Sequence, residues 1–231
     1  MKEELYKLIE EENTDKICEM IQGDVLDSMD NEEVKRVFRL LMQLRNLEVI
    51  DALAKRSRYF PPEMLDIEIH NHNDKDFVAN VLSKYGKKFR FKDPDVAGLL
   101  FETACKAECL SMLNFLLGKG LAEWEYPRLI SGSEKLLPIV EKIRVAGLHP
   151  DTIVTFFVEA AISDQCEKRI QNLMNLGFKI TTVNSEGKTA VDVLRSGIEA
   201  FPYSKDKKGQ QEKLKDEQGL KTLQRFSSLA G

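Results

Sequence analysis

The chain has 231 residues, of which 42% are hydrophobic and 31% are charged, and its formal net charge is −4. This slightly acidic balance argues against a nucleic-acid-binding protein, because phosphate recognition needs a basic face. No run of about 20 apolar residues occurs and the N-terminus is charged, so we expect a cytoplasmic protein without a membrane span or ordinary signal peptide, while specialised export stays open. Reduced thiols packed in a core are the expected state of the four scattered cysteines, Cys18, Cys105, Cys109 and Cys166.

Helical stretches that end at a small residue recur along most of the chain. A repeat length between about 20 and 50 residues is typical of stacked supersecondary units. A glycine after a helix is expected to take the left-handed conformation and to turn the chain sharply. The ends recur at a similar spacing throughout, at Gly23, Ser57, Gly86, Gly120, Gly147 and Gly177.

A second helical stretch precedes most of these closing helices. Apolar residues recur there at spacings of three and four, which predicts amphipathic helices over 32–44, 62–70, 95–107 and 151–162. The β-branched runs are short and no Asn-Gly or Asp-Gly turn is present, so the predicted class is all-α. The start signals are N-caps at Asp30, Asp93 and Asp151 and first-turn prolines at Pro62 and Pro94.

The C-terminal segment differs in charge from the rest of the chain. Residues 204–231 hold seven Lys or Arg and four Asp or Glu, which leaves 27 basic and 34 acidic residues before them. We therefore expect one continuous array over residues 1–203 and a charged, partly disordered tail over 204–231. Leu220, Leu223 and Phe226 recur at three, so the tail could contain a C-terminal capping helix.

Two segments resemble the ankyrin-repeat family. The run ACKAECLSMLNFLLGKG (104–120) is similar to the second half of an ankyrin unit, in which a helix with consecutive leucines leads to a glycine. The run NSEGKTAVDVL (184–194) is similar to the opening of a unit, where Gly187 would supply the turn and Thr189 the cap, while Ala190 would allow close packing. Residues 4–24 resemble an N-terminal unit.

The resemblance implies an ankyrin-like α-solenoid of about six to seven stacked helical hairpins. The Thr-Pro-Leu-His signature of the family is absent, so we expect short links that lack full β-hairpins. A helical-hairpin array of the HEAT type, or one of no recognised class, fits the middle units as an alternative.

Candidate metal and catalytic residues are few. His70 and His72 could bind a metal only with a third ligand such as Asp74, and a polar loop between two helices is the favoured interpretation. Cys105 and Cys109 lie one helical turn apart, but no second pair follows them, which favours small core residues. We predict no cofactor, no metal and no catalytic residue.

The links between units carry aromatic and basic residues. Solenoids bind partners through their concave face and their links, and interface hot spots favour Trp, Tyr and Arg. The phenylalanines of the links could instead fold back over helix edges. The predicted partner-binding residues are Arg58, Tyr59, Phe60, Lys88, Arg90, Trp124 and Tyr126.

The expected function is a non-enzymatic protein–protein interaction scaffold, a monomer that binds another protein and neither nucleic acid nor membrane. The KKFRF run (87–91) could stack single-stranded bases, but an acidic patch on a protein partner uses the same chemistry. One alternative is an inhibitor or immunity-type protein that blocks a basic toxin or enzyme. Another is an enzyme or a metal-binding solenoid.

Overall fold

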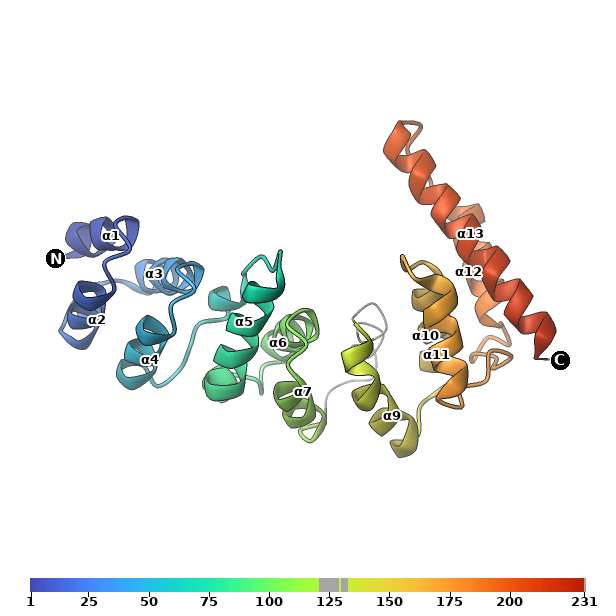
Figure 1. The fold of residues 1–231 in the computed structure, drawn as a ribbon, viewed down its shortest axis with the longest axis horizontal. Helices are drawn as coiled ribbons and strands as arrows, with labels where there is room; N and C mark the ends of the chain where they lie inside the picture. The colour runs from blue at the N-terminus through green and yellow to red at the C-terminus, as the bar shows by residue number, and fades with distance from the viewer. Residues whose placement is uncertain (121–128, 130–132, 231) are drawn as a thin grey trace. The chain divides into compact units, whose positions relative to one another are not determined.

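The computed structural model describes residues 1–120, 129 and 133–230, and internal contacts divide the chain into two compact units, residues 1–121 and 122–231 (Figure 1). The described residues form helices and no strand, which confirms the predicted all-α class. None of their helices is both long and apolar enough to cross a membrane. Two units thus occupy the chain, where the sequence predicts one array over residues 1–203.

The first unit is a succession of helical elements that come two by two. Helix α1 (Lys2–Glu10) precedes α2 (Thr14–Gln22), and α3 (Asn31–Gln43) precedes α4 (Leu47–Arg56). The 3₁₀ helix η2 (Pro62–Leu65) precedes α5 (His72–Tyr85), and α6 (Pro94–Lys106) precedes α7 (Leu110–Leu117). Short 3₁₀ helices, η1 (Leu26–Ser28) and η3 (Gly86–Lys88), lie in two of the links between these pairs.

The first members of the pairs stack in one row and the second members in another. Helix α1 contacts α3, α3 contacts η2, and η2 contacts α6. Helix α2 contacts α4, α4 contacts α5, and α5 contacts α7. Each element therefore packs on the corresponding element of the next pair, which is the nearest-neighbour burial of a repeat array. Fully buried side chains from both rows, such as Leu5, Ile17, Leu41 and Ile50, form the core.

The third pair departs from the predicted helix over 62–70. Only Pro62–Leu65 is helical, and residues 66–70 are not. In this segment Ile67 and Ile69 are half-buried and alternate with the exposed Asp66 and Glu68. Alternation with a period of two suits an extended chain, and β-branched side chains favour it further. A single 3₁₀ turn therefore takes the place of a first helix.

Sharp turns occur inside the pairs as well as after them. Glu12, Arg45 and Glu108 have φ of 53°, 53° and 55°, in the left-handed region that non-glycine residues seldom adopt. The next residues, Asn13 and Asn46, cap α2 and α4 with their side chains. The chain thus repeats one turn conformation where two helices of a pair meet.

The glycines after the helices divide into two kinds. Gly120, Gly147 and Gly177 have φ of 78°, 89° and 89°, as predicted. Gly86 instead has φ of −54°, and an added Cβ would lie 2.4 Å from Sδ of Met112. A larger residue at Gly86 would therefore have to displace the side chain of Met112 in α7, and the prediction of a left-handed turn there is wrong. Gly23 is likewise outside the left-handed region, with φ of −81°.

The second unit is organised around one central helix. It comprises η5 (Glu134–Leu136), α9 (Leu137–Ala146), α10 (Pro150–Ala161), α11 (Cys166–Asn175), α12 (Ala190–Ala200) and α13 (Lys207–Leu229). Helix α10 contacts α11, α12 and α13, and α13 also contacts α11 and α12. Most of residues 204–231, for which the sequence predicts a charged tail that could contain a capping helix, form a 23-residue helix that buries Leu223 and Phe226 against the unit.

The helix starts follow the sequence signals with one exception. Asp30 caps α3 in a capping box, Asp93 caps α6, and Thr189 caps α12 after Gly187 with φ of 74°. At α10 the cap is His149, and Asp151, predicted as the cap, lies in the first turn. Pro150 at the first helical position accounts for the shift, since its fixed φ is suited to that position.

Candidate partner-binding surface

Two links of the first unit are joined to each other by hydrogen bonds. The backbone N–H of Phe60 donates to the carbonyl of Lys88 at 3.0 Å. Nζ of Lys88 donates to the carbonyl of Ser57 at 2.7 Å. The link after α4 and the link after α5 are therefore held side by side, and Lys88, half-buried between them, has a structural contact.

Phenylalanine rings lie beneath these links. Phe60 is 2% exposed and Phe89 is 1% exposed, and their ring centroids are 5.6 Å apart in an edge-to-face contact. Phe60 also contacts the rings of Phe38 and Tyr85, at 6.0 and 6.1 Å. The expectation that Phe60 contacts a partner must therefore be corrected, because its ring folds inward and belongs to the core.

Tyr59 lies above this core between two arginines. Its side chain is 44% exposed. The guanidinium carbons of Arg58 and Arg90 lie 5.2 and 5.1 Å from the centre of its ring, within the range of a cation–π contact. We call Arg58, Tyr59 and Arg90 the Tyr59 cluster. It brings together three of the predicted binding residues, from two successive links.

A second aromatic ring lies between two lysines at the next boundary. Nζ of Lys87 and Nζ of Lys119 lie 5.2 and 5.6 Å from the ring centre of Phe115. Phe91 meets the same ring edge-to-face at 5.0 Å. We call Lys87, Phe115 and Lys119 the Phe115 cluster, and the two clusters together the link surface.

Sequence reasoning did not find the Phe115 cluster as a site. Phe115 stands in a leucine-rich helix whose apolar residues predict a core. The position of Phe115 on the helix could have indicated the site, because it lies off the buried face that Leu113 and Leu116 form. Leu113 and Leu116 are buried, whereas Phe115 between them is only half-buried. Trp124 and Tyr126, also predicted to bind, lie outside the described residues.

Many basic residues of the first unit have ion-pair partners, whereas the cations of the link surface have none among the described residues, as is also true of Lys16 and Lys55. Along the first row, Lys2 pairs with Glu33 at 2.5 Å and Lys35 pairs with Glu63 at 3.4 Å. Within the described part of the chain, none of the four cations of the link surface is within ion-pair distance of a carboxylate. The link surface therefore gathers four cations, unpaired in the described chain, around two rings, although residues 1–121 contain 18 basic and 23 acidic residues.

The turns inside the pairs carry polar contacts that join successive pairs. Nδ2 of Asn46 donates to Oγ1 of Thr14 at 2.7 Å. Nε of Arg45 lies 2.7 Å from Oδ1 of Asp74, whose side chain is 4% exposed. Nζ of Lys75 lies 2.6 Å from Oε1 of Glu108. We call these three contacts the turn ladder.

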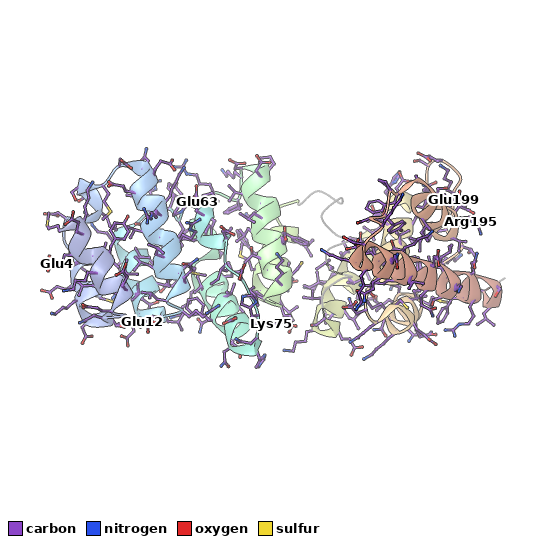
Figure 2. The ribbon with its side chains drawn as sticks, turned by 90° about the horizontal axis from the view of Figure 1, so that it is seen from above. Glu4, Glu12, Glu63, Lys75, Arg195 and Glu199 are labelled. Atoms are coloured by element: carbon purple, nitrogen blue, oxygen red, sulfur yellow. The ribbon has the colours of Figure 1, made fainter. Side chains whose placement is uncertain are left out.

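The turn ladder lies along one edge of the first unit. In Figure 2, Glu12 and Lys75 lie along one edge of this unit and Glu63 lies toward the opposite edge. An open groove of about 780 Å³ lies beside the ladder, and its walls are both polar and apolar. Its lining includes Asn13, Asp15, Glu48, Asp76 and Asn80.

The contacts of His70 and His72 bear on the metal-binding alternative. Asp74, the proposed third ligand, is bound by Arg45 and accepts the backbone N–H of His70 at 3.0 Å. Nε2 of His70 lies 2.8 Å from Glu68, and Nε2 of His72 lies 3.2 Å from Asp76. Over residues 1–120, 129 and 133–230, no group of three or more His, Cys, Asp or Glu side chains could hold a metal ion.

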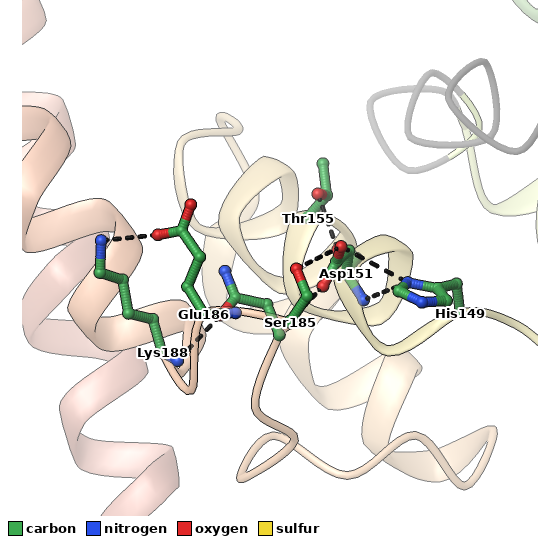
Figure 3. A network of polar contacts seen from close by, with 7 residues as sticks. His149, Asp151, Thr155, Ser185, Glu186 and Lys188 are labelled. Atoms are coloured by element: carbon green, nitrogen blue, oxygen red, sulfur yellow. Dashed lines mark hydrogen bonds and ion pairs between the residues drawn. The ribbon is translucent and has the colours of Figure 1, made fainter.

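A polar network in the second unit contains the residue types of a catalytic triad (Figure 3). Oδ1 and Oδ2 of Asp151 accept the backbone N–H and the hydroxyl of Ser185 at 2.5 and 2.9 Å. Nδ1 of His149 lies 3.5 Å from Oδ2 of the same carboxylate. The serine hydroxyl therefore donates to the carboxylate, whereas a triad requires it to meet the imidazole.

This network fastens a loop to the start of α10. The hydrogen bond from the Ser185 backbone, more than any other contact, lowers the pKa of Asp151. The loop is turned by Asn184, whose side chain accepts the backbone N–H groups of Glu186 and Lys188. A loop anchor is the role that this geometry supports.

Comparisons with known proteins gave no match to a family model, to a curated protein or to a solved structure. The resemblance of residues 104–120 and 184–194 to ankyrin repeats therefore stays a prediction. Among the surfaces of the described residues, the link surface carries the clearest chemistry for binding.

Proposed function

We propose that this protein is a non-enzymatic protein–protein interaction scaffold whose first unit binds a partner protein through the link surface. The observation that carries the proposal is the exposed ring of Tyr59 between Arg58 and Arg90, which no carboxylate of the described chain neutralises. Tyr and Arg are enriched among residues that dominate interface energetics. Contact with the ring restricts both guanidinium groups before binding, which lowers the entropy lost when a partner arrives.

An ankyrin-like solenoid is the architecture that we propose for the first unit. The order of contacts along its two rows supports this, since each element packs on its counterpart in the next pair. The repeated left-handed turn at Glu12, Arg45 and Glu108 supports it further. The turns at Arg45 and Glu108 belong to the second and fourth pairs. The third pair, in which η2 replaces the first helix, lacks this turn in the described chain.

Affinity capture tests whether the link surface binds a partner. Full-length protein is immobilised, exposed to a lysate of its source cells, and the retained proteins are identified by mass spectrometry. The test variant combines Arg58→Ala, Tyr59→Ala and Arg90→Ala, all at exposed positions. Its control combines Lys16→Ala and Lys55→Ala, which removes the same charge from exposed sites elsewhere in the unit.

We expect that the wild type and the control retain a protein that the test variant, here called the link variant, does not retain. Circular dichroism should show that both variants keep the helical content of the wild type. Equal retention by all three proteins would show that binding does not use the Tyr59 cluster.

A further inference from the structure

We infer that the link surface binds an extended acidic peptide segment whose carboxylates recur at about every third position. This inference rests on the proposed function and names the chemistry of the partner. Three observations support it. The cations of the two clusters recur at a regular spacing, they have no carboxylate partner in the described chain, and they already contact the ring faces.

The cations of the two clusters repeat one arrangement, although the rings come from different positions, Tyr59 from the link after α4 and Phe115 from helix α7. In each, an aromatic ring is contacted by two cations from successive segments of the array. The separation of Arg58 and Lys87 along the sequence equals that of Arg90 and Lys119. Corresponding cations therefore recur once per pair, and each cluster crosses one boundary between neighbouring pairs.

The stacking of helices sets the separation of the clusters. Packed helices lie about 8–10 Å apart, so clusters displaced by one pair are separated by roughly 10 Å. A polyproline II segment rises about 3.1 Å per residue with three residues per turn, so its residues i and i+3 face the same side about 9 Å apart. Carboxylates at that spacing would meet one cluster each.

The chemistry of the clusters favours carboxylates over nucleic acid. Binding of single-stranded nucleic acid stacks bases on exposed aromatic faces. The ring of Tyr59 is already contacted by two guanidinium groups, and the ring of Phe115 by two ammonium groups and the edge of Phe91. The cations remain able to accept anions, whereas the rings serve to hold the cations in place.

The charge of the surrounding unit limits the length of the anionic segment. Residues 1–121 are acidic overall, with 23 acidic against 18 basic residues. A long polyanion would meet repulsion beyond the two clusters, but a short acidic peptide would be confined to them. Steering by this local positive patch would also make association sensitive to salt.

Fluorescence anisotropy with defined probes tests the inference on the full-length protein. The main probe is the fluorescein-labelled peptide (Glu-Ser-Pro)₄. A second peptide has the same composition with its glutamates in two adjacent blocks, a third is (Lys-Ser-Pro)₄, and the fourth probe is a single-stranded oligo-dT of matching length. The test variant is Arg58→Gln with Arg90→Gln, and its control is Lys16→Gln with Lys55→Gln.

We expect the regular acidic peptide to bind most tightly, with an affinity that falls as salt is added. The Arg58→Gln, Arg90→Gln variant should bind it about tenfold more weakly, and the control should bind as the wild type does. Equal weakening in both variants would overturn the inference, because it would show a general effect of net charge. Tighter binding of oligo-dT would overturn it in favour of nucleic acid.

Three further outcomes distinguish failure of this inference from failure of the proposed function. If no acidic peptide binds while the capture experiment still shows a partner lost from the link variant, the acidic chemistry is refuted and the interaction surface stands. If the two acidic peptides bind equally well, the spacing of one carboxylate in three is refuted. If neither peptide binding nor capture depends on the Tyr59 cluster, both proposals fail.

Discussion

Helix α13 lies close to the end of α10 at Gly219, and this contact predicts how a larger residue there would change stability. A Cβ added there would lie 2.4 Å from the carbonyl oxygen of Ala161 and 2.9 Å from its carbon, whereas ordinary contact begins at 3.4 Å. Gly219→Ala must therefore move one helix by about 1 Å, and overpacking of this kind costs about 1–3 kcal/mol. The higher helix propensity of Ala returns up to about 1 kcal/mol. We expect a net loss of about 1–2 kcal/mol in the free energy of unfolding.

The control for this substitution is Gly197→Ala in α12, where an added Cβ meets nothing within 4 Å. Here only the propensity gain acts, so stability should rise by up to about 1 kcal/mol. Urea unfolding followed by circular dichroism measures both changes. Hydrogen exchange would show where the structure is destabilised, because amides near the end of α10 should exchange faster in Gly219→Ala and not in Gly197→Ala. A rise in stability for both variants would refute the close packing of α13 on α10.

Two further predictions concern the first unit. Glu12→Gly relieves a left-handed conformation at an exposed site and should change the free energy of unfolding by less than about 1 kcal/mol. Arg45→Gly gives the same relief but leaves the buried carboxylate of Asp74 without its guanidinium partner. Urea unfolding should therefore show that Arg45→Gly is less stable than Glu12→Gly by about 1–3 kcal/mol. Equal effects of the two substitutions would mean that this ion pair adds nothing to stability. The hydrogen bond from Tyr85 to Asp51, at 2.5 Å, raises the pKa of Tyr85 to about 12. Its contribution to stability is complete below the ordinary pKa of 10.0 and is lost as the pH rises toward 12. Because the pKa of Tyr203 is also raised to about 12, a tyrosinate absorbance titration should contain a late component that Tyr85→Phe reduces by one tyrosine.

The parts of the fold that follow from local sequence were predictable. Apolar spacing identifies amphipathic helices because one face must be buried, and it located most helices of both units. The caps at Asp30, Asp93 and Thr189 depend only on a side chain and the backbone within the next helical turn. Helix caps of this kind can be predicted from neighbouring residues without knowing the rest of the fold.

Features that depend on tertiary contact were not predictable. Phe60 and Tyr59 are neighbours of similar character, yet Phe60 packs against Phe38 and Phe89 while Tyr59 faces outward. Nothing in the local sequence indicates which ring turns inward. Gly86 offers a second case, since the atom nearest to an added Cβ there belongs to Met112, which lies in helix α7 of the next pair.

The left-handed turns inside the pairs show a different limit. A glycine is the usual sign of positive φ, but Glu12, Arg45 and Glu108 adopt it without that sign. Two of them gain ion pairs with the next or preceding pair, Arg45 with Asp74 and Glu108 with Lys75. A long charged side chain at this position can therefore offset part of the backbone cost, which a search for glycines overlooks.

The two sets of charges in the first unit suit different tasks. At the turn ladder, Arg45 and Lys75 are neutralised by carboxylates of neighbouring pairs, so their charge fixes how one pair meets the next. At the link surface, the cations contact rings and have no carboxylate in the described chain. Contacts of the first kind limit sliding between pairs and so keep the spacing of the clusters constant. A ligand that must bridge two clusters gains affinity from that fixed spacing, because the array does not have to be ordered at the moment of binding.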